Sequence, residues 1–356
     1  MIYVIVPPFH KGANEYSLYA DFMQNVDTPH THLIYPEREF LDVIDRETPG
    51  FYDNQKWMPI LLKQAFSVIP KLKSGDAVVF IDFWNPCVPA FYAHCKINSL
   101  HVKLLGWFHG ATFMFGDYLN EFFPRGGFLA NELEWLRMFD QIWYASDFFV
   151  EDIKRMNLFS DKFIKVDSPF DVFDKQFKQY LGLEKRYDVI FPFRLDPDKV
   201  DLPVLEQIIK HLEEKNISIL ITSVRQMSEY DKKALARYKN VIVMEYVDDN
   251  QHLETLARSR VILSLAKQEG WGYTVLKAIS LGCYPVLINA GVYMELYQSK
   301  FLFDSPTEAH RKILLALSEE VPDINYIFRG SRTKYTFSNY YFDEQNLLRR
   351  KNSCVE

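Results

Sequence analysis

Short β-rich runs alternate with amphipathic segments along this 356-residue chain, and this alternation constrains its fold more than any other feature. Strands joined through helices lie parallel, because a parallel connection needs a long crossover. The alternation therefore predicts an α/β fold built on parallel sheets. The expected strands are residues 2–6, 31–35, 77–82, 102–108, 141–146 and 163–166, and then 188–193, 218–223, 241–246, 261–266 and 284–289.

The pattern restarts near Tyr187, after a turn-rich stretch that we interpret as a linker at residues 171–186. It predicts two doubly wound, Rossmann-like domains, residues 1–170 and 187–325, that face each other across a central cleft. Ligands of such sheets bind beyond the carboxyl ends of the strands. Amphipathic helices are expected at residues 56–72, 146–156, 202–215, 231–239, 250–259 and 274–282.

The composition is that of a globular protein, with 48% hydrophobic and 25% charged residues. The four cysteines show neither metal-ligand spacing nor a disulfide framework, so a reducing, cytoplasmic location is expected. Residues 1–16 lack the basic leader of a signal peptide and are interpreted as a first strand. The longest apolar region, residues 77–94, is interrupted by Asp82, Asn85 and two prolines, so no membrane span is expected.

The C-terminal segment, residues 326–356, is unusually aromatic and basic. Residues 325–352 hold six Lys or Arg, two acids and seven aromatic residues. Residues 1–175 carry 16 Lys and Arg against 23 Asp and Glu. The C-terminal segment is therefore expected to pack back on the acidic first domain, and a contact with nucleic acid is the alternative.

Two basic residues follow the first expected strand of the second domain, in the run Phe-Arg-Leu-Asp-Pro-Asp-Lys. Arg194 and Lys199 would stand at the carboxyl end of that strand, inside the cleft, with Asp196 or Asp198 capping the next helix. A forked guanidinium and a point-charge ammonium suit a diphosphate. The alternative is a capped helix with two solvated basic residues.

A glutamate on a glycine-rich turn follows a later strand of the same domain. Glu269 precedes Gly270, Trp271 and Gly272, and a helix is expected to begin near Tyr273. Glycines let the backbone approach a ligand closely, and the start of a helix points its N–H groups at an anion. Because the carboxylate accepts hydrogen bonds from hydroxyl groups, the turn suits a sugar beside a phosphate. The alternative is a plain strand-to-helix turn.

These motifs stand in the order found in retaining glycosyltransferases of family 4, which have the two-domain GT-B fold. Residues 188–297 resemble the second domain of that family, and Leu-Gly-Cys-Tyr-Pro-Val-Leu and Ala-Gly-Val-Tyr-Met-Glu-Leu-Tyr follow the two motifs above in the family order. The first domain carries weaker matches. Residues 144–155 are similar to the family's strand–serine–helix segment, and residues 104–113 to its strand that ends in His-Gly, which includes His109. Gly12 stands where relatives have a glycine-rich loop near the donor phosphates.

The resemblance implies transfer of a sugar, with retention of configuration, from a nucleotide-diphosphate sugar to an acceptor hydroxyl, and a UDP-sugar is the expected donor. Arg194, Lys199 and the helix start would stabilise the leaving diphosphate, Glu269 would hold sugar hydroxyls, and His109 would contact the donor sugar. No cofactor and no metal are expected, since the relatives need none and the chain has no Asp-x-Asp signature. The donor-binding residues implied are Gly12, Arg194, Lys199, Glu269, Gly270, Trp271, Gly272, Tyr273 and Thr274.

The chain departs from the family pattern at Lys277, where relatives commonly have a second glutamate that binds the nucleotide ribose. Lysine cannot accept hydrogen bonds from the ribose hydroxyls. Either another group holds the ribose, the nucleotide binds differently, or catalysis has been lost. A non-catalytic nucleotide-sugar-binding protein is therefore one rival function, and a nucleotide-sugar epimerase is another.

The acceptor is expected to bind the first domain, around Gly12, Trp84 and the aromatic segment at residues 110–122. Core packing is the alternative interpretation of those aromatic residues. Part of this segment resembles, more faintly, viral enzymes that glycosylate hydroxymethylated bases in DNA. A glycan, a small molecule and such a DNA base therefore all stay open as acceptors. Salt-dependent binding to duplex DNA would separate the last from the others.

Overall fold

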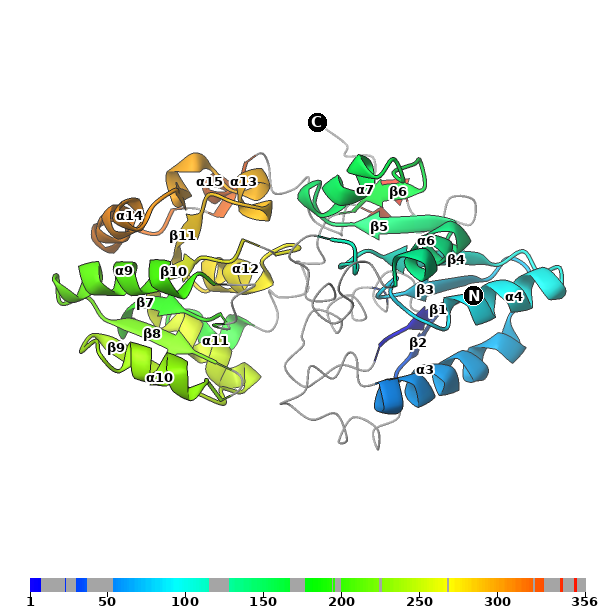
Figure 1. The fold of residues 1–356 in the computed structure, drawn as a ribbon, viewed down its shortest axis with the longest axis horizontal. Coiled ribbons are helices and arrows are strands. Elements are labelled where there is room, and N and C mark those ends of the chain that lie inside the picture. Colours follow the sequence, from blue (N-terminus) through cyan, green and yellow to red (C-terminus); the bar gives the residue numbers. More distant parts are fainter. Residues whose placement is uncertain are drawn as a thin grey trace. The chain divides into compact units, whose positions relative to one another are not determined.

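The computed structural model describes residues 1–7, 23, 30–36, 54–114, 128–166, 177–193, 195, 200–223, 226–267, 269–322, 324–329, 340–341 and 349–350. The chain divides into two compact units. Unit 1 is Met1–Val172 with Thr333–Glu356, and unit 2 is Phe173–Arg332. Each unit holds one six-stranded sheet whose described pairings are all parallel, which confirms the expected α/β fold (Figure 1).

The sheet of unit 1 has the strand order β2-β1-β3-β4-β5-β6, and each strand lies within an expected run. β1 and β3 are buried along their whole length, as in sheets that are covered on both faces. The strands are β1 (Ile2–Ile5), β2 (Thr31–Ile34), β3 (Ala77–Phe80), β4 (Lys103–Trp107), β5 (Gln141–Tyr144) and β6 (Phe163–Lys165). The short antiparallel pair β13 (Tyr340–Tyr341) and β14 (Arg349–Arg350) also belongs to unit 1.

Aromatic side chains form much of the core of unit 1. The rings of Trp107 and Trp143, on neighbouring strands, meet edge to face with centroids 4.6 Å apart. Phe80 on β3 makes a similar contact with Phe91, at 5.4 Å, which holds a helix against the sheet. The described helices are α3 (Asn54–Val68), α4 (Val88–Ile97), α6 (Leu129–Met138) and α7 (Glu151–Arg155). Our sequence analysis did not anticipate α4 and α6.

The sheet of unit 2 has the strand order β12-β11-β10-β7-β8-β9, with a final strand that we did not anticipate. The order reverses between β7 and β10, so right-handed crossovers place the helices that follow these two strands on opposite faces. The strands are β7 (Tyr187–Phe191), β8 (Ile219–Thr222), β9 (Val241–Met244), β10 (Ser259–Ser264), β11 (Tyr284–Ile288) and β12 (Leu302–Phe303).

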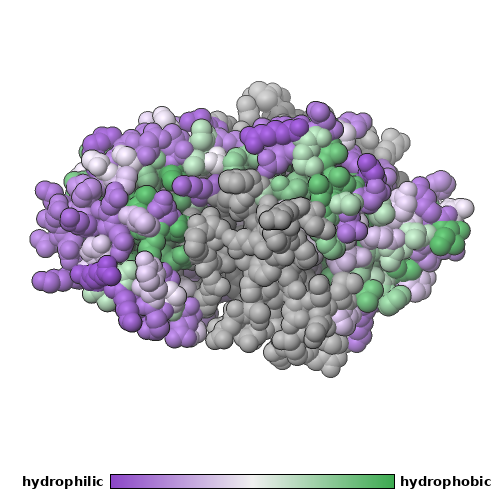
Figure 2. Space-filling model, in the orientation of Figure 1, coloured by the Kyte–Doolittle hydropathy of each residue, from purple (hydrophilic) through white to green (hydrophobic). Residues whose placement is uncertain are grey.

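The helices of unit 2 start at polar caps and turn their apolar faces to the sheet. The helices are α9 (Leu202–Glu213), α10 (Glu229–Leu235), α11 (Asp249–Ala257), α12 (Tyr273–Ser280), α13 (Val292–Leu296), α14 (Pro306–Ser318) and α15 (Ile324–Ile327). α14 packs against α9, and α11 packs against α12. The surface over α9, α10 and α14 is mostly hydrophilic in Figure 2, as expected for amphipathic helices. Among the described helices of both units, none is long and apolar enough to span a bilayer.

Candidate functional site

A segment that bears a glutamate lies between the end of β10 and the start of α12, and we name its described residues, 265–267 and 269–272, the Glu269 turn. Gly272 is the N-cap residue of α12 and has the left-handed backbone angles φ 74° and ψ 48°. A Cβ atom added at Gly272 would lie 2.9 Å from Cε1 of Tyr293, so glycine is required here for both conformation and space. Gly272 brings no side-chain acceptor to the start of α12, and the start of a helix is a favourable place for an anion.

The residues predicted to bind the donor differ in their access to solvent. Glu269, Gly270 and Thr274 are half-buried. Trp271 and Tyr273 are only 6% and 7% exposed, so their side chains are largely packed in the core. The indole N–H of Trp271 is buried and has no hydrogen-bond acceptor among the described residues. Residues 269–272 thus lie in the turn, Tyr273 and Thr274 begin α12, and their side chains differ in exposure.

A tyrosine that our sequence analysis did not single out supports this turn. Tyr293 is fully buried, and its hydroxyl lies 2.8 Å from that of Ser264, the last residue of β10. Burial, and next the charge of Glu269, raise the pKa of Tyr293 well above its usual value. The phenol is therefore protonated. Its sequence signal was the run Ala-Gly-Val-Tyr, which we interpreted only as a glycine-rich turn.

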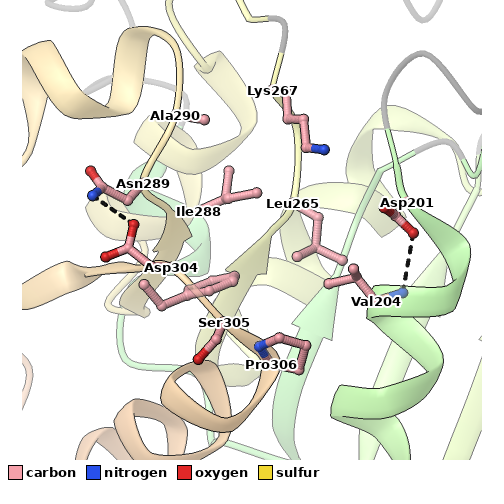
Figure 3. Close-up of a pocket in the computed structure, with 11 residues that line it drawn as sticks. Asp201, Val204, Leu265, Lys267, Ile288, Asn289, Ala290, Asp304, Ser305 and Pro306 are labelled. Carbon is pink, nitrogen blue, oxygen red and sulfur yellow. Dashed lines mark hydrogen bonds between the residues drawn. The ribbon is translucent and has the colours of Figure 1, made fainter.

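A pocket of about 310 Å³ lies at the carboxyl ends of β10, β11 and β12 (Figure 3). Its polar groups come from Lys267 after β10, Asn289 after β11, and Asp201 and Asp304 at the starts of α9 and α14. The Asn289 amide donates a hydrogen bond to Asp304 at 2.8 Å, which fixes both side chains on one wall. Ser305 and a set of apolar side chains complete the lining, and the apolar residues are Val204, Leu265, Ile288, Ala290, Phe303 and Pro306. The pocket pairs an apolar surface with hydroxyl-binding groups.

The two predicted cations of unit 2, Arg194 and Lys199, lie outside the described residues, as does Gly12 of unit 1. The helix that follows these cations is described. Its N-cap is Asp201, whose carboxylate accepts a hydrogen bond from the N–H of Val204 at 3.3 Å. The prediction that Asp196 or Asp198 caps this helix was therefore wrong, because α9 begins at Leu202, as expected, and the residue directly before it, Asp201, is the cap.

Lys277, the departure from the family pattern, is buried on α12 with 7% exposure. The charge of Lys277 acts on His252 of α11. Burial is the larger cause and Lys277 the smaller cause that lower the pKa of His252 to about 3. Both residues lie where α11 packs against α12. A cation in this position disfavours a protonated histidine beside it.

In unit 1, His109 follows the end of β4 and is half-buried. Its ring hydrogen-bonds to the main chain of Ile81, which follows β3, while burial lowers the pKa of His109 to about 4. The imidazole is therefore neutral at physiological pH and is tied to the exits of two neighbouring strands. The structure places it at the carboxyl edge of the unit 1 sheet, where ligands of such sheets bind.

A buried carboxylate that our sequence analysis missed organises the same edge. Glu132 on α6 has an exposed fraction of 0% and accepts three hydrogen bonds. The donors are Nε1 of Trp84 at 2.8 Å, the N–H of Thr112 at 2.7 Å and the hydroxyl of Thr112 at 2.5 Å. Burial raises the pKa of Glu132, and the three hydrogen bonds oppose that shift. Glu132 thus joins the segments that follow β3 and β4.

Comparisons with known proteins agree with this arrangement. Residues 172–330 match the family model described as glycosyl transferases group 1. The tRNA-queuosine alpha-mannosyltransferase of Drosophila melanogaster is 25% identical over 165 residues, which are 45% of this chain and 42% of that protein. The chain therefore aligns with less than half the length of this curated relative.

Solved structures with low sequence identity share the fold of the chain. Sucrose-phosphate synthase from Thermosynechococcus elongatus is similar with a TM-score of 0.60 at 12% identity, over 89% of this chain and 90% of that one. An α,α-trehalose-phosphate synthase (UDP-forming) from Burkholderia xenovorans, in complex with glucose-6-phosphate, has a TM-score of 0.58 at 12% identity, over 90% of this chain and 92% of that one. Residues 172–330 therefore match the glycosyl transferases group 1 model, within a chain that has the GT-B fold.

Proposed function

We propose that this chain is a retaining glycosyltransferase that moves a sugar from a nucleotide-diphosphate sugar to an acceptor hydroxyl. The observation that carries the proposal is the Glu269 turn, because it sets a half-buried carboxylate beside the glycine-capped start of α12 inside the group 1 domain. A carboxylate can hold sugar hydroxyls, and an open helix start can hold a phosphate. The two halves of a nucleotide sugar need these two groups side by side.

In the proposed mechanism, loss of the diphosphate is the demanding step, because its negative charge grows as the glycosidic bond breaks. The first turn of α12, Arg194 and Lys199 would stabilise that charge, and preorganised groups of this kind are worth about 3 kcal/mol each. His109, neutral because its pKa is about 4, would contact the donor sugar as an uncharged group. The leaving phosphate would take the acceptor proton, so the proposal includes neither a metal nor a cofactor.

The pocket beside the turn supports a further part of this proposal. Among the described residues, its lining holds Asp201, Asp304 and the Asn289 amide together with one cation, Lys267, so the described charges do not favour a phosphate. Carboxylates and amides bind hydroxyl groups, and apolar walls suit the face of a sugar ring. We assign the pocket to a hydroxyl-bearing part of a substrate, and the diphosphate to the start of α12.

UDP is the expected nucleotide of the donor. Support comes from the UDP-forming synthase above and from a trehalose-6-phosphate structure from E. coli bound with UDP-2-fluoro glucose, which has the same fold at a TM-score of 0.59 and 12% identity, over 89% of this chain and 90% of that one. Lys277 stands at the sequence position where relatives commonly have a ribose-binding glutamate, and it is buried on α12. Another group would then bind the ribose hydroxyls.

A modified nucleoside in tRNA is a second candidate acceptor, beside the glycan, small molecule or hydroxymethylated DNA base that the sequence analysis left open. The name of the Drosophila relative is the observation that favours it. The acidic balance of residues 1–175 opposes binding of any polyanion except through local basic patches. A steep fall of binding with salt would identify a nucleic-acid acceptor.

The test is a product assay. The protein would be incubated with a panel of UDP- and GDP-sugars and with tRNA, hydroxymethylated DNA and oligosaccharides, and products would be identified by mass spectrometry and their anomeric configuration by NMR. Transfer with retention, lost in Glu269→Gln, is the expected result. Epimerised donor in the absence of acceptor would instead indicate an epimerase. Donor binding without hydrolysis or transfer would indicate a non-catalytic binding protein.

A further inference from the structure

Two fully buried hydroxyl groups contact the Glu269 turn from the protein interior. Ser264 ends β10, Tyr293 lies in α13, and their hydroxyl oxygens are 2.8 Å apart. Both residues have an exposed fraction of 0%. Buried hydroxyl groups need hydrogen-bond partners, and these two satisfy each other across 29 residues of sequence.

The pair reaches both ends of the turn. At the upstream end, the Ser264 hydroxyl accepts a hydrogen bond from the N–H of Ala266 at 3.3 Å. At the downstream end, Gly272 lies so close to the ring of Tyr293 that an added Cβ atom would be 2.9 Å from Cε1. The entry and the exit of the turn that carries Glu269 therefore both lie against one buried pair.

We propose that Ser264 and Tyr293 are positioning residues that fix Glu269 and the first turn of α12 for the donor. Because both side chains are fully buried, neither contacts the donor itself. The inference rests on the proposed function, in which Glu269 and the helix start hold the two halves of the donor. A displacement of about 1 Å in such a site can reduce the rate by roughly 100-fold.

A phenol suits this position because its ring and its hydroxyl make different contacts. The ring fills the space beside Gly272, and the hydrogen bond to Ser264 fixes the ring orientation. Tyr293 is brought there by Gly291, whose φ of 56° is a conformation that favours glycine. Phenylalanine would keep the ring and lose the link to β10.

The first test is amide hydrogen exchange of residues 265–275 in the unliganded protein, measured by mass spectrometry. Tyr293→Phe and Ser264→Ala are each expected to speed exchange in this segment by about 10-fold. Tyr284→Phe is the matched control, because Tyr284 is also buried and donates a hydrogen bond to Glu319 at 3.4 Å, but stands at the start of β11. Unchanged exchange in both test variants would overturn the inference.

The second test is kinetic and uses UDP-glucose as the first donor probe. Tyr293→Phe and Ser264→Ala are expected to lower kcat by about 10-fold or more, while Tyr284→Phe keeps the wild-type kcat. If both test variants keep the wild-type kcat while Glu269→Gln lowers it, the positioning role is contradicted. The proposed function is then unaffected. An inactive wild type would count against the proposed function, and the exchange result would then decide the positioning role by itself.

Discussion

The carboxyl edges of the two sheets are organised by different means. In unit 1 a single buried side chain, Glu132, joins the segments after β3 and β4 through Trp84 and Thr112. In unit 2 the backbone does this work, because Gly272 turns the chain sharply into α12 against the ring of Tyr293. The sheets also differ in order, since β1 lies between β2 and β3, whereas β7 lies between β8 and β10.

The two edges should therefore be destabilised by different kinds of substitution. An edge built on hydrogen bonds to a buried carboxylate fails when the acceptor is removed, since buried donors are then left unsatisfied. An edge built on a glycine fails when a side chain is added, because a left-handed backbone and a close ring both exclude a Cβ atom. Unit 1 should therefore be sensitive to the loss of a side-chain acceptor, and unit 2 to the addition of a side chain.

Glu132→Ala should give the largest effect on folding. It leaves two buried N–H donors and a hydroxyl without their acceptor, and we expect a loss of about 3 to 5 kcal/mol in the free energy of unfolding. Chemical denaturation would measure it. Glu134→Ala, an exposed position on the same helix, is the control and should change stability by less than about 1 kcal/mol. Equal losses in the two variants would show that Glu132 does not hold the edge of unit 1.

Gly272→Ala should come next. The left-handed conformation costs about 1 kcal/mol for alanine, and crowding against Tyr293 adds about 2 kcal/mol. Gly182→Ala shares the positive φ, 77°, but has no atom within 4 Å of the new Cβ atom, so only the conformational cost of about 1 kcal/mol is expected. A loss in Gly272→Ala no larger than in Gly182→Ala would contradict the close packing of the turn.

Acidification should lower the stability of both units, and the loss should level off at a different pH in each. The folded-state pKa is about 4 for His109 in unit 1 and about 3 for His252 in unit 2, below the unfolded value of 6.5. Stability is therefore lost as the pH falls below 6.5, and the loss levels off near pH 4 for His109 and near pH 3 for His252. Unfolding curves at several pH values, with His109→Gln and His252→Gln, would measure it. If the wild-type protein loses stability on acidification and neither variant reduces that loss, these two histidines are not its cause.

Lys277→Met should give the smallest effect. It removes the second cause of the depressed pKa of His252, so that pKa should rise while burial keeps it below the usual histidine range. An NMR titration of the histidine side chains would follow it. No movement of the His252 resonance would show that Lys277 and His252 do not interact across α11 and α12.

Features that are local in sequence were predicted well. Eleven strands and the Glu269 turn could be inferred because each is encoded within a few neighbouring residues. α14 was missed although Ser305, Pro306 and Glu308 form a capping pattern, in which the Ser305 hydroxyl accepts from the Glu308 N–H at 3.2 Å. That pattern could have identified it.

Features that depend on distant partners could not be inferred. Trp84 and Glu132 are 48 residues apart, and Ser264 and Tyr293 are 29 apart, so only the fold brings these pairs together. A single sequence does not reveal which buried polar groups meet. We consequently did not single out Glu132 or Tyr293 from the sequence.

The central claim is that the Glu269 turn binds a nucleotide-sugar donor. The most direct measurement is hydrogen exchange of the whole chain with and without saturating UDP and UDP-sugars. We predict slower exchange in the peptides that cover residues 269–275, because the N–H groups at the start of α12 bind the diphosphate. Protection confined to other segments, or stabilisation by the ligand with no change at this turn, would contradict the claim.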